Sequence, residues 1–241
     1  MVTAKEHYDQ LLAERYTWMF GSFEKKAAEQ KAIFERFGIV ADGAARAVDL
    51  GCGPGAQSVA LAQLGFRVRS IDFSRKMLAE LAVRKCNLPI EIVEGDIRDV
   101  AELAGPRADV VVCMGDTLAH LETKTDVMAV LAGTMKVLAR GGRLVLAFRD
   151  QTVALEGLDR FISIQTGEDA IMTCFLEYEP ETIVVNDLIY VRENAKWTLR
   201  KSCYRKLRLD PDWVVATLTR SGFVLDHRDS NRGLVTLVAH T

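Results

Sequence analysis

The chain has 241 residues, which suits one large domain or one domain that carries an insertion. Hydrophobic residues make up 49% and charged residues 27%, so the chain can bury a substantial core and is not of a disordered type. The formal net charge of -2 gives no basic excess, and this excludes an obvious nucleic-acid or anionic-membrane partner.

The cysteines and the N-terminus bear on the cellular compartment. Five cysteines are an odd number, and none forms a C-x-x-C pair, so we interpret them as reduced thiols of a cytoplasmic protein. The N-terminus is charged and lacks the apolar core of a signal peptide. No apolar run approaches the roughly 20 residues that a membrane span needs. We therefore expect a cytoplasmic protein without a membrane partner.

The N-terminal segment has a helical pattern. Apolar and aromatic residues recur at helical spacing over residues 5–37, with a break near Gly21 and an end at Gly38. Tyr8 and Tyr16 lie on this pattern, and the simplest interpretation is that their rings pack on the core.

A glycine-rich turn follows the first predicted strand. Residues 47–50 are small, apolar or acidic and predict a short buried strand, and Gly51, Gly53 and Gly55 then interrupt it. Glycine lets a backbone turn tightly and lie against a ligand. Residues 56–64 have helical spacing, so strand, turn and helix predict the start of a nucleotide-binding βαβ unit.

Two cofactor classes use such a turn. The pattern G-x-G-x-x-G/A is satisfied, so NAD stays open at this point. An acid, Asp49, precedes the glycines, and the second strand (66–71) ends at Asp72, where a carboxylate can accept from a ribose diol. A helix (75–85) and a third strand (90–93) lead to Asp96.

This order of elements resembles the class I methyltransferases that use S-adenosylmethionine (SAM). The resemblance implies SAM as the cofactor and assigns to Asp96 a contact with the adenine amino group. Asp49 has an alternative structural role, in which it orients the turn by accepting backbone N–H groups. The expected cofactor contacts are Tyr16, Asp49, Gly51, Cys52, Gly53, Gly55, Asp72, Phe73, Asp96, Ile97, Met114 and Gly115.

The rest of the chain predicts a doubly wound sheet with an insertion. Strands are expected at 109–114 and 143–148, with a helix over 126–138 between them. Three antiparallel strands (171–178, 183–192 and 197–209) predict a meander, and a helix (213–221) and a hairpin (223–227, 234–239) follow. We expect an α/β fold with a mostly parallel seven-stranded sheet, as one domain over 1–241 with an antiparallel lid at 151–209.

The loop after the fourth predicted strand indicates which group of methyltransferases the sequence resembles. Residues 113–121 look like the Gly-Asn-Ser-x-x-His-Leu loop of glycine and sarcosine N-methyltransferases, although Asn-Ser is here Asp116-Thr117. In that family a carboxylate-binding arginine follows strand five, and Arg149 occupies the matching place. A tryptophan of the family corresponds to Tyr16. The resemblance implies N-methylation of a small acidic or zwitterionic compound.

Four residues are expected near the transferred methyl group: Asp116, His120, Arg149 and Tyr178. Asp116 suits the cofactor amino group or a cationic substrate. His120 is either a hydrogen-bonding loop residue or a general base. Arg149 either binds an acceptor carboxylate or pairs with an acid such as Asp150 or Glu177. A basic cluster at 200–208 is expected to be a solvated strand edge, with an anion site as the alternative.

The sequence therefore predicts a SAM-dependent methyltransferase of a small molecule, with an amine favoured over a hydroxyl or carboxylate acceptor. Alternatives are an O-methyltransferase, an NAD-dependent oxidoreductase and a non-catalytic SAM-binding module. No spacing of histidines and acids suggests a metal, so none is expected. The oligomeric state stays open.

Overall fold

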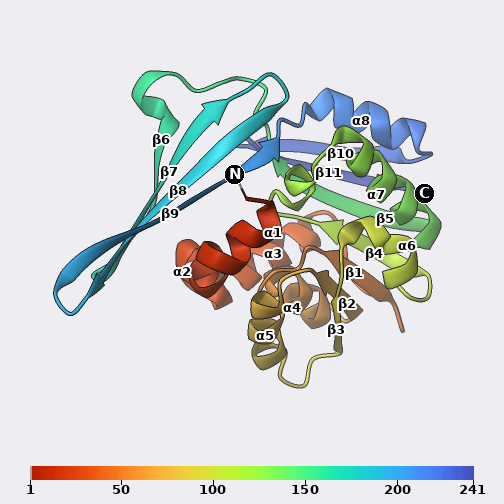
Figure 1. Ribbon diagram of the computed structural model, residues 1–241. Helices are drawn as coiled ribbons and strands as arrows, with labels where there is room; N and C mark the ends of the chain where they lie inside the picture. Colours follow the sequence, from red (N-terminus) through yellow and green to blue (C-terminus); the bar gives the residue numbers. More distant parts are fainter. Residues whose placement is uncertain (1) are drawn as a thin grey trace.

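The computed structural model describes residues 2–241, which form two β-sheets with flanking helices (Figure 1). The larger sheet has seven strands in the order β10-β11-β5-β4-β1-β2-β3. Its strands are β1 (Arg46–Leu50), β2 (Arg67–Asp72), β3 (Ile90–Glu94), β4 (Ala108–Cys113), β5 (Leu138–Arg149), β10 (Val224–Asn231) and β11 (Leu234–His240). Strands β1 to β5 run parallel, and β11 is antiparallel to both of its neighbours. The expected α/β fold of class I is confirmed.

Helices cover both faces of this sheet. One buried cluster joins the sheet to α3 (Phe23–Arg36), α4 (Ala56–Gln63) and α5 (Arg75–Arg84). The other joins it to α6 (Val100–Leu103), α7 (Lys124–Val137) and α8 (Pro211–Arg220). Because both faces are buried, residues 110–113 of β4 and 144–148 of β5 are continuous apolar runs, and alternate residues of β1 belong to different clusters.

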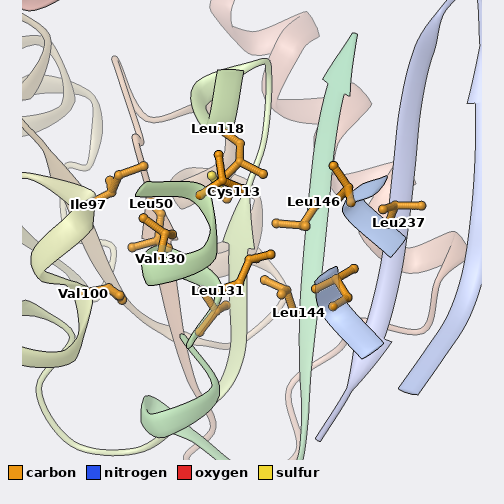
Figure 2. Close-up of a cluster of buried hydrophobic side chains, with 14 of the residues drawn as sticks. Leu50, Ile97, Val100, Cys113, Leu118, Val130, Leu131, Leu144, Leu146 and Leu237 are labelled. Carbon is orange, nitrogen blue, oxygen red and sulfur yellow. The ribbon is translucent and has the colours of Figure 1, made fainter. Parts of the chain in front are cut away.

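Figure 2 shows the second cluster in detail. Leu144 and Leu146 of β5 and Leu237 of β11 lie on the same side of the sheet as Val130 and Leu131 of α7. These leucines are almost completely buried. This packing fixes the carboxyl end of β5, where Arg149 begins the wall of a cavity described below.

The N-terminal segment is more broken than its periodicity predicts. Helix α1 (Ala4–His7) runs into a π-helical turn and a 3₁₀ turn before α2 (Tyr16–Phe20). Gly21 has a φ of 81°, and Ser22 then caps α3 by accepting a hydrogen bond from the N–H of Lys25. Single π-helical turns occur often at functional sites, and this one begins at Tyr8.

The insertion forms a separate antiparallel sheet of four strands, β6 (Phe161–Thr166), β7 (Ala170–Tyr178), β8 (Thr182–Glu193) and β9 (Lys196–Leu207). The sequence predicted the last three, with close bounds, but not β6. In Figure 1 this sheet lies beside the larger one, and α1 and α2 lie next to it. We call it the lid sheet. Helix α1 contacts β9, and α2 contacts β6, so the N-terminal segment and the lid sheet form one layer.

Candidate active site

The glycine turn that follows β1 packs closely against the loop after β4 and against α5. Gly51 has a φ of 67°, and a Cβ there would lie 2.2 Å from Cγ2 of Thr117, in the loop after β4. A Cβ on Gly55 would lie 2.2 Å from Cδ1 of Leu81 on α5. At Gly53 the nearest atom would be 3.5 Å away, so this glycine leaves space in front of the turn.

That space belongs to a cavity of about 540 Å³ at the carboxyl ends of β1, β2 and β3. Its size lies within the ~300–1,000 Å³ that is usual for small-molecule sites. Val2, Thr3 and Ala4 of the N-terminal segment complete its wall. The predicted cofactor residues in this wall are Tyr16, Gly51, Gly53, Asp72, Phe73, Asp96, Ile97 and Gly115. We call it the turn-side cavity.

Asp72 is an acid of the turn-side cavity that backbone groups hold on both carboxylate oxygens. Its Oδ2 accepts a hydrogen bond from the N–H of Gly53 and its Oδ1 one from the N–H of Ser74, each 2.8 Å long. Burial raises the pKa of Asp72, and these backbone donors oppose the rise. A carboxylate has about four lone-pair sites, so each oxygen can accept one further hydrogen bond from a ligand hydroxyl.

Asp96 lies in the same wall and is paired with a neighbour. Its Oδ2 lies 2.7 Å from Nη2 of Arg98, and its Oδ1 accepts a hydrogen bond from the Arg98 N–H. Burial acts to raise the pKa of Asp96, but the bonds from Arg98 hold it below its ordinary value. The acid therefore stays ionised and can accept a further hydrogen bond.

Asp49 and Gly55 line neither of the two cavities. Asp49 is buried behind the turn, where the Ser58 hydroxyl on α4 donates to its Oδ2 over 2.6 Å. Burial raises the pKa of Asp49 to about 7. This geometry gives Asp49 a role in holding α4 against β1, rather than a direct contact with a ligand.

A second cavity, of about 700 Å³, lies between the larger sheet and the lid sheet, and we call it the lid-side cavity. Asp116, Arg149 and Tyr178 all line it, as do the predicted cofactor residues Cys52 and Met114. The two cavities meet, because eight residues line both: Tyr8, Tyr16, Gly51, Gly53, Gly115, Thr117, His120 and Lys206.

His120 is held at this junction by both ring nitrogens. Its Nδ1 donates to the backbone carbonyl of Asp116 over 2.9 Å, so the Nε2 lone pair is left to accept. The hydroxyls of Tyr8 and Tyr204 each lie 3.2 Å from Nε2. Burial, with the nearby charge of Lys206, lowers the pKa of His120 to about 4, and the ring is therefore neutral at pH 7.

Asp116 has partners for both of its carboxylate oxygens. Its Oδ1 accepts a 2.6 Å hydrogen bond from the N–H of Arg149, and its Oδ2 lies 2.6 Å from Nζ of Lys206 on β9. Burial acts to raise the pKa of Asp116, but the Lys206 ammonium holds it below its ordinary value. Asp116 thus lies beside Arg149, not across the cleft from it, and ties the lid sheet to the larger sheet.

The side chains of Arg149 and Tyr178 differ in their contacts with the rest of the protein. Within residues 2–241, the side chain of Arg149 has neither an ion pair nor a hydrogen bond, and it is exposed toward the lid-side cavity. The hydroxyl of Tyr178 donates to Oε1 of Gln151 over 3.3 Å, and the guanidinium of Arg208 lies over its ring.

The basic cluster at 200–208 is not one solvated edge. Lys206 is partly buried at the junction, and Arg208 donates to three backbone carbonyls, those of Gln151, Thr152 and Glu179. Alternation along β9 places Lys206 and Tyr204 on one face, but it does not say which face turns inward. Sequence reasoning therefore missed Lys206 and Tyr204 as site residues.

A buried histidine–carboxylate pair lies in the layer above the lid-side cavity. Nε2 of His7 on α1 donates to Oδ2 of Asp187 on β8 over 2.8 Å, and both side chains are almost fully buried. The His7 ring also packs on the ring of Tyr204, with centroids 4.4 Å apart. His7 and Asp187 carry no motif, and nothing in the sequence marks them as partners.

Among residues 2–241, no helix is long and apolar enough to cross a membrane. No group of three or more histidines, cysteines and acids in that range has the geometry of a metal site.

The sequence has relatives among known methyltransferases. Residues 47–142 match the family described as a methyltransferase domain. The chain is similar to a cypemycin N-terminal methyltransferase of Streptomyces sp, with 34% identity over 52% of this chain and 51% of that protein. It is also similar to a glycine/sarcosine N-methyltransferase of Aphanothece halophytica, with 35% identity over 47% and 44%. The chain thus spans about half the length of these relatives.

Solved structures share the fold over nearly the whole chain. The CcbJ methyltransferase of Streptomyces caelestis has a TM-score of 0.76 at 18% identity and covers 98% of this chain and 95% of that one. CalS10 of Micromonospora echinaspora, an amino pentose methyltransferase solved with SAM, has a TM-score of 0.73 at 21% identity, covering 94% and 95%. Residues 47–142 therefore match a methyltransferase domain, and the chain has the fold of SAM-dependent methyltransferases.

Proposed function

We propose that the protein transfers a methyl group from SAM to the amine of a small acceptor that carries an acid group. The observation that carries this proposal is the junction of the two cavities, where Tyr8, Tyr16, His120 and Lys206 face both. A cofactor on one side and an acceptor on the other meet only there. One relative is named a glycine/sarcosine N-methyltransferase and another an N-terminal methyltransferase, and both names agree with an amine acceptor.

The residues present fit SAM. Asp72, with acceptor capacity left on both oxygens, would hold the ribose hydroxyls, and Asp96 would accept from the adenine amino group. Phe73 and Ile97 would flank the adenosine half of SAM in the turn-side cavity. The remaining contacts would come from Tyr16, Gly51, Cys52, Gly53, Met114 and Gly115. When bound, SAM supplies a methyl group on a positively charged sulfur.

The acid–base groups at the junction favour an amine over an alcohol. An alcohol needs a base that removes its proton, whereas a neutral amine already has a free lone pair. His120, with a pKa of about 4, is a weak base, and both carboxylate oxygens of Asp116 are engaged. Neither group is suited to ionising an alcohol.

The tyrosines can orient the amine instead. Burial raises the pKa of Tyr8 and Tyr204 well above the ordinary range, so both hydroxyls keep their protons. A hydroxyl that donates to Nε2 of His120 has its oxygen free to accept from an amine N–H. That contact would point the amine lone pair toward the cofactor side, and such alignment contributes as much as ~7–11 kcal/mol in favourable cases.

Arg149 is the proposed partner of the acceptor's acid group. Its guanidinium lines the lid-side cavity and, within residues 2–241, forms no ion pair with Asp150 or Glu177. A planar guanidinium can bind a carboxylate through two parallel hydrogen bonds, and this fixes orientation as well as charge.

The test has a binding step and a turnover step. Calorimetry should show binding of SAM and of its demethylated product, S-adenosylhomocysteine (SAH), but no binding of NAD. A metabolite mixture supplied with methyl-labelled SAM should then yield a labelled secondary or tertiary amine that carries an acid. A labelled ether or ester would contradict the amine assignment, and NAD binding without a response to SAM or SAH would refute the cofactor assignment.

Arg149→Lys separates the substrate role of Arg149 from a purely structural one. We expect kcat/KM for the identified acceptor to fall while SAM affinity and Tm hold. Arg140→Lys is the matched control, because Arg140 is exposed near the other end of β5 and lines neither cavity. A loss of Tm alone would make Arg149 a structural residue of the lid.

A further inference from the structure

A second arginine lies beside Arg149 in the wall of the lid-side cavity. In the sheet, Arg149 at the end of β5 pairs with Leu234 at the start of β11. Arg232 belongs to the turn just before Leu234, and the carbonyl of Gly233 in that turn accepts a 2.8 Å hydrogen bond from the N–H of Asp150. Both arginines line the same cavity. They therefore come from adjacent strand ends of one wall.

Neither guanidinium is neutralised by the described part of the chain, residues 2–241, where no acid lies within ion-pair distance of Arg149 or Arg232. The acids that line the cavity have other partners. Asp116 is paired with Lys206 and Asp187 with His7, while Asp150 accepts through Oδ1 from the hydroxyl and the N–H of Thr152. This wall of the cavity therefore carries two guanidinium groups without an ion-pair partner, beside the carboxylate of Asp150, which Thr152 binds through uncharged donors.

The backbone at Arg232 is unusual for an arginine. Its φ is 49°, and Gly233 follows with a φ of 77°. Two-residue hairpin turns with positive φ at both positions favour asparagine, aspartate or glycine first. The β8–β9 turn of this protein follows that rule, with Asn194 at a φ of 50°. An arginine in this conformation carries a local cost, and such costs concentrate at functional sites.

We propose that Arg232 is a second anion-binding residue of the acceptor site, and that the acceptor carries an oxyanion group with two negative charges. This inference rests on the proposed function, because it takes the lid-side cavity as the acceptor site. Arg149 and Arg232 together bind the doubly charged group at the wall, and the amine reaches the junction at His120. Two kinds of acceptor supply two negative charges. A phosphate monoester carries both on one group, and a dicarboxylate carries one on each of two neighbouring carboxylates. The test distinguishes them.

The experiment uses the full chain saturated with SAH. Succinate, inorganic phosphate and acetate are titrated by calorimetry at constant ionic strength. Hydrogen bonds to charged groups are worth ~1.5–3 kcal/mol, so the second arginine should make the better dianion bind at least about tenfold tighter than acetate. The tighter of phosphate and succinate identifies the kind of oxyanion.

Arg232→Asn removes the guanidinium but keeps a residue that the turn favours. We expect this variant to keep its SAH affinity, to have an unchanged or higher Tm, and to lose about tenfold in dianion affinity while acetate binding changes little. Arg140→Asn removes one positive charge elsewhere and should leave all three affinities unchanged.

Two results would overturn the inference. One is dianion binding no tighter than acetate binding, or no binding of either dianion, by protein that binds SAH. The other is an equal effect of Arg232→Asn and Arg140→Asn. Failure of SAH itself to bind is a different result, because it refutes the proposed function and with it the basis of the inference.

Discussion

Lys206→Met is expected to destabilise the protein strongly at pH 7. Nζ of Lys206 lies 2.6 Å from Oδ2 of Asp116, and the two side chains are only 14% and 10% exposed. Removing one partner leaves a buried carboxylate without its counter-charge, which costs about 3–5 kcal/mol. At ~2–4 °C per kcal/mol for a domain of this size, the Tm should fall by about 6–20 °C.

The loss of stability in Lys206→Met should depend on pH, in a direction set by the pKa of Asp116. Although burial acts to raise the pKa of Asp116, the Lys206 ammonium holds it below its ordinary value of 3.8. A carboxyl with a lower pKa in the folded state than in the unfolded state contributes stability above the unfolded pKa, and this is lost as pH falls further. In Lys206→Met the ammonium is gone and the N–H of Arg149 still opposes the burial, so the pKa of Asp116 should rise. The deficit relative to wild type should therefore shrink between pH 7 and pH 4.

Urea unfolding at several pH values between 7 and 4 measures this effect. The double variant Asp116→Asn with Lys206→Met should recover part of the loss, because no charge is left buried. Lys124→Met is the matched control, since Lys124 pairs with Glu181 at 3.0 Å on the surface, where a pair is worth about 0–1 kcal/mol. The reasoning fails if Lys206→Met costs no more than Lys124→Met at pH 7.

Two other residues give separate predictions. Asp72→Ala should weaken SAH binding roughly 10- to 150-fold in calorimetry. Asp42→Ala, at an exposed loop position, should not, and equal affinities would remove Asp72 from the site. His120 has a folded pKa of about 4 against an ordinary 6.5, so its stabilising effect is present above pH 6.5 and is lost as pH falls toward 4. The unfolding free energy of His120→Gln should depend less on pH in that range than that of wild type, and equal slopes would contradict the burial of a neutral ring.

The parallel half of the fold was predictable because its signals are local. Each strand has a short stretch of apolar or alternating residues, and the glycines after β1 mark the turn without information from distant residues. The acids at strand ends follow from the same rule, since the carboxyl ends of parallel strands meet at one edge. Asp72 and Asp96 both line the turn-side cavity as this predicts. Their contacts with a cofactor stay a prediction.

The lid side of the site was not predictable in the same way. The contact of Asp116 with Lys206 joins residues 90 positions apart and depends on how the lid sheet docks. Strand β6 was missed because its register against β7 shifts between Ser163 and Gln165, which disturbs the alternation that marks a strand. Tyr8 was noticed as an aromatic residue, but its contact with His120 depends on the π-helical turn.

The pairing of His7 with Asp187 also sets an order of events during synthesis. The two residues are 180 positions apart, so the first helix leaves the ribosome long before its partner strand β8 exists. Chains fold from the N-terminus as they emerge, and contacts between distant segments form slowly. The parallel sheet can begin to assemble from β1 to β4 while Tyr8 and Leu12 still lack the lid sheet that covers them. The segment around His7 is therefore made well before β8 but is ordered only with it, and a nascent chain that stops short of β8 should expose this aromatic segment to chaperones and proteases.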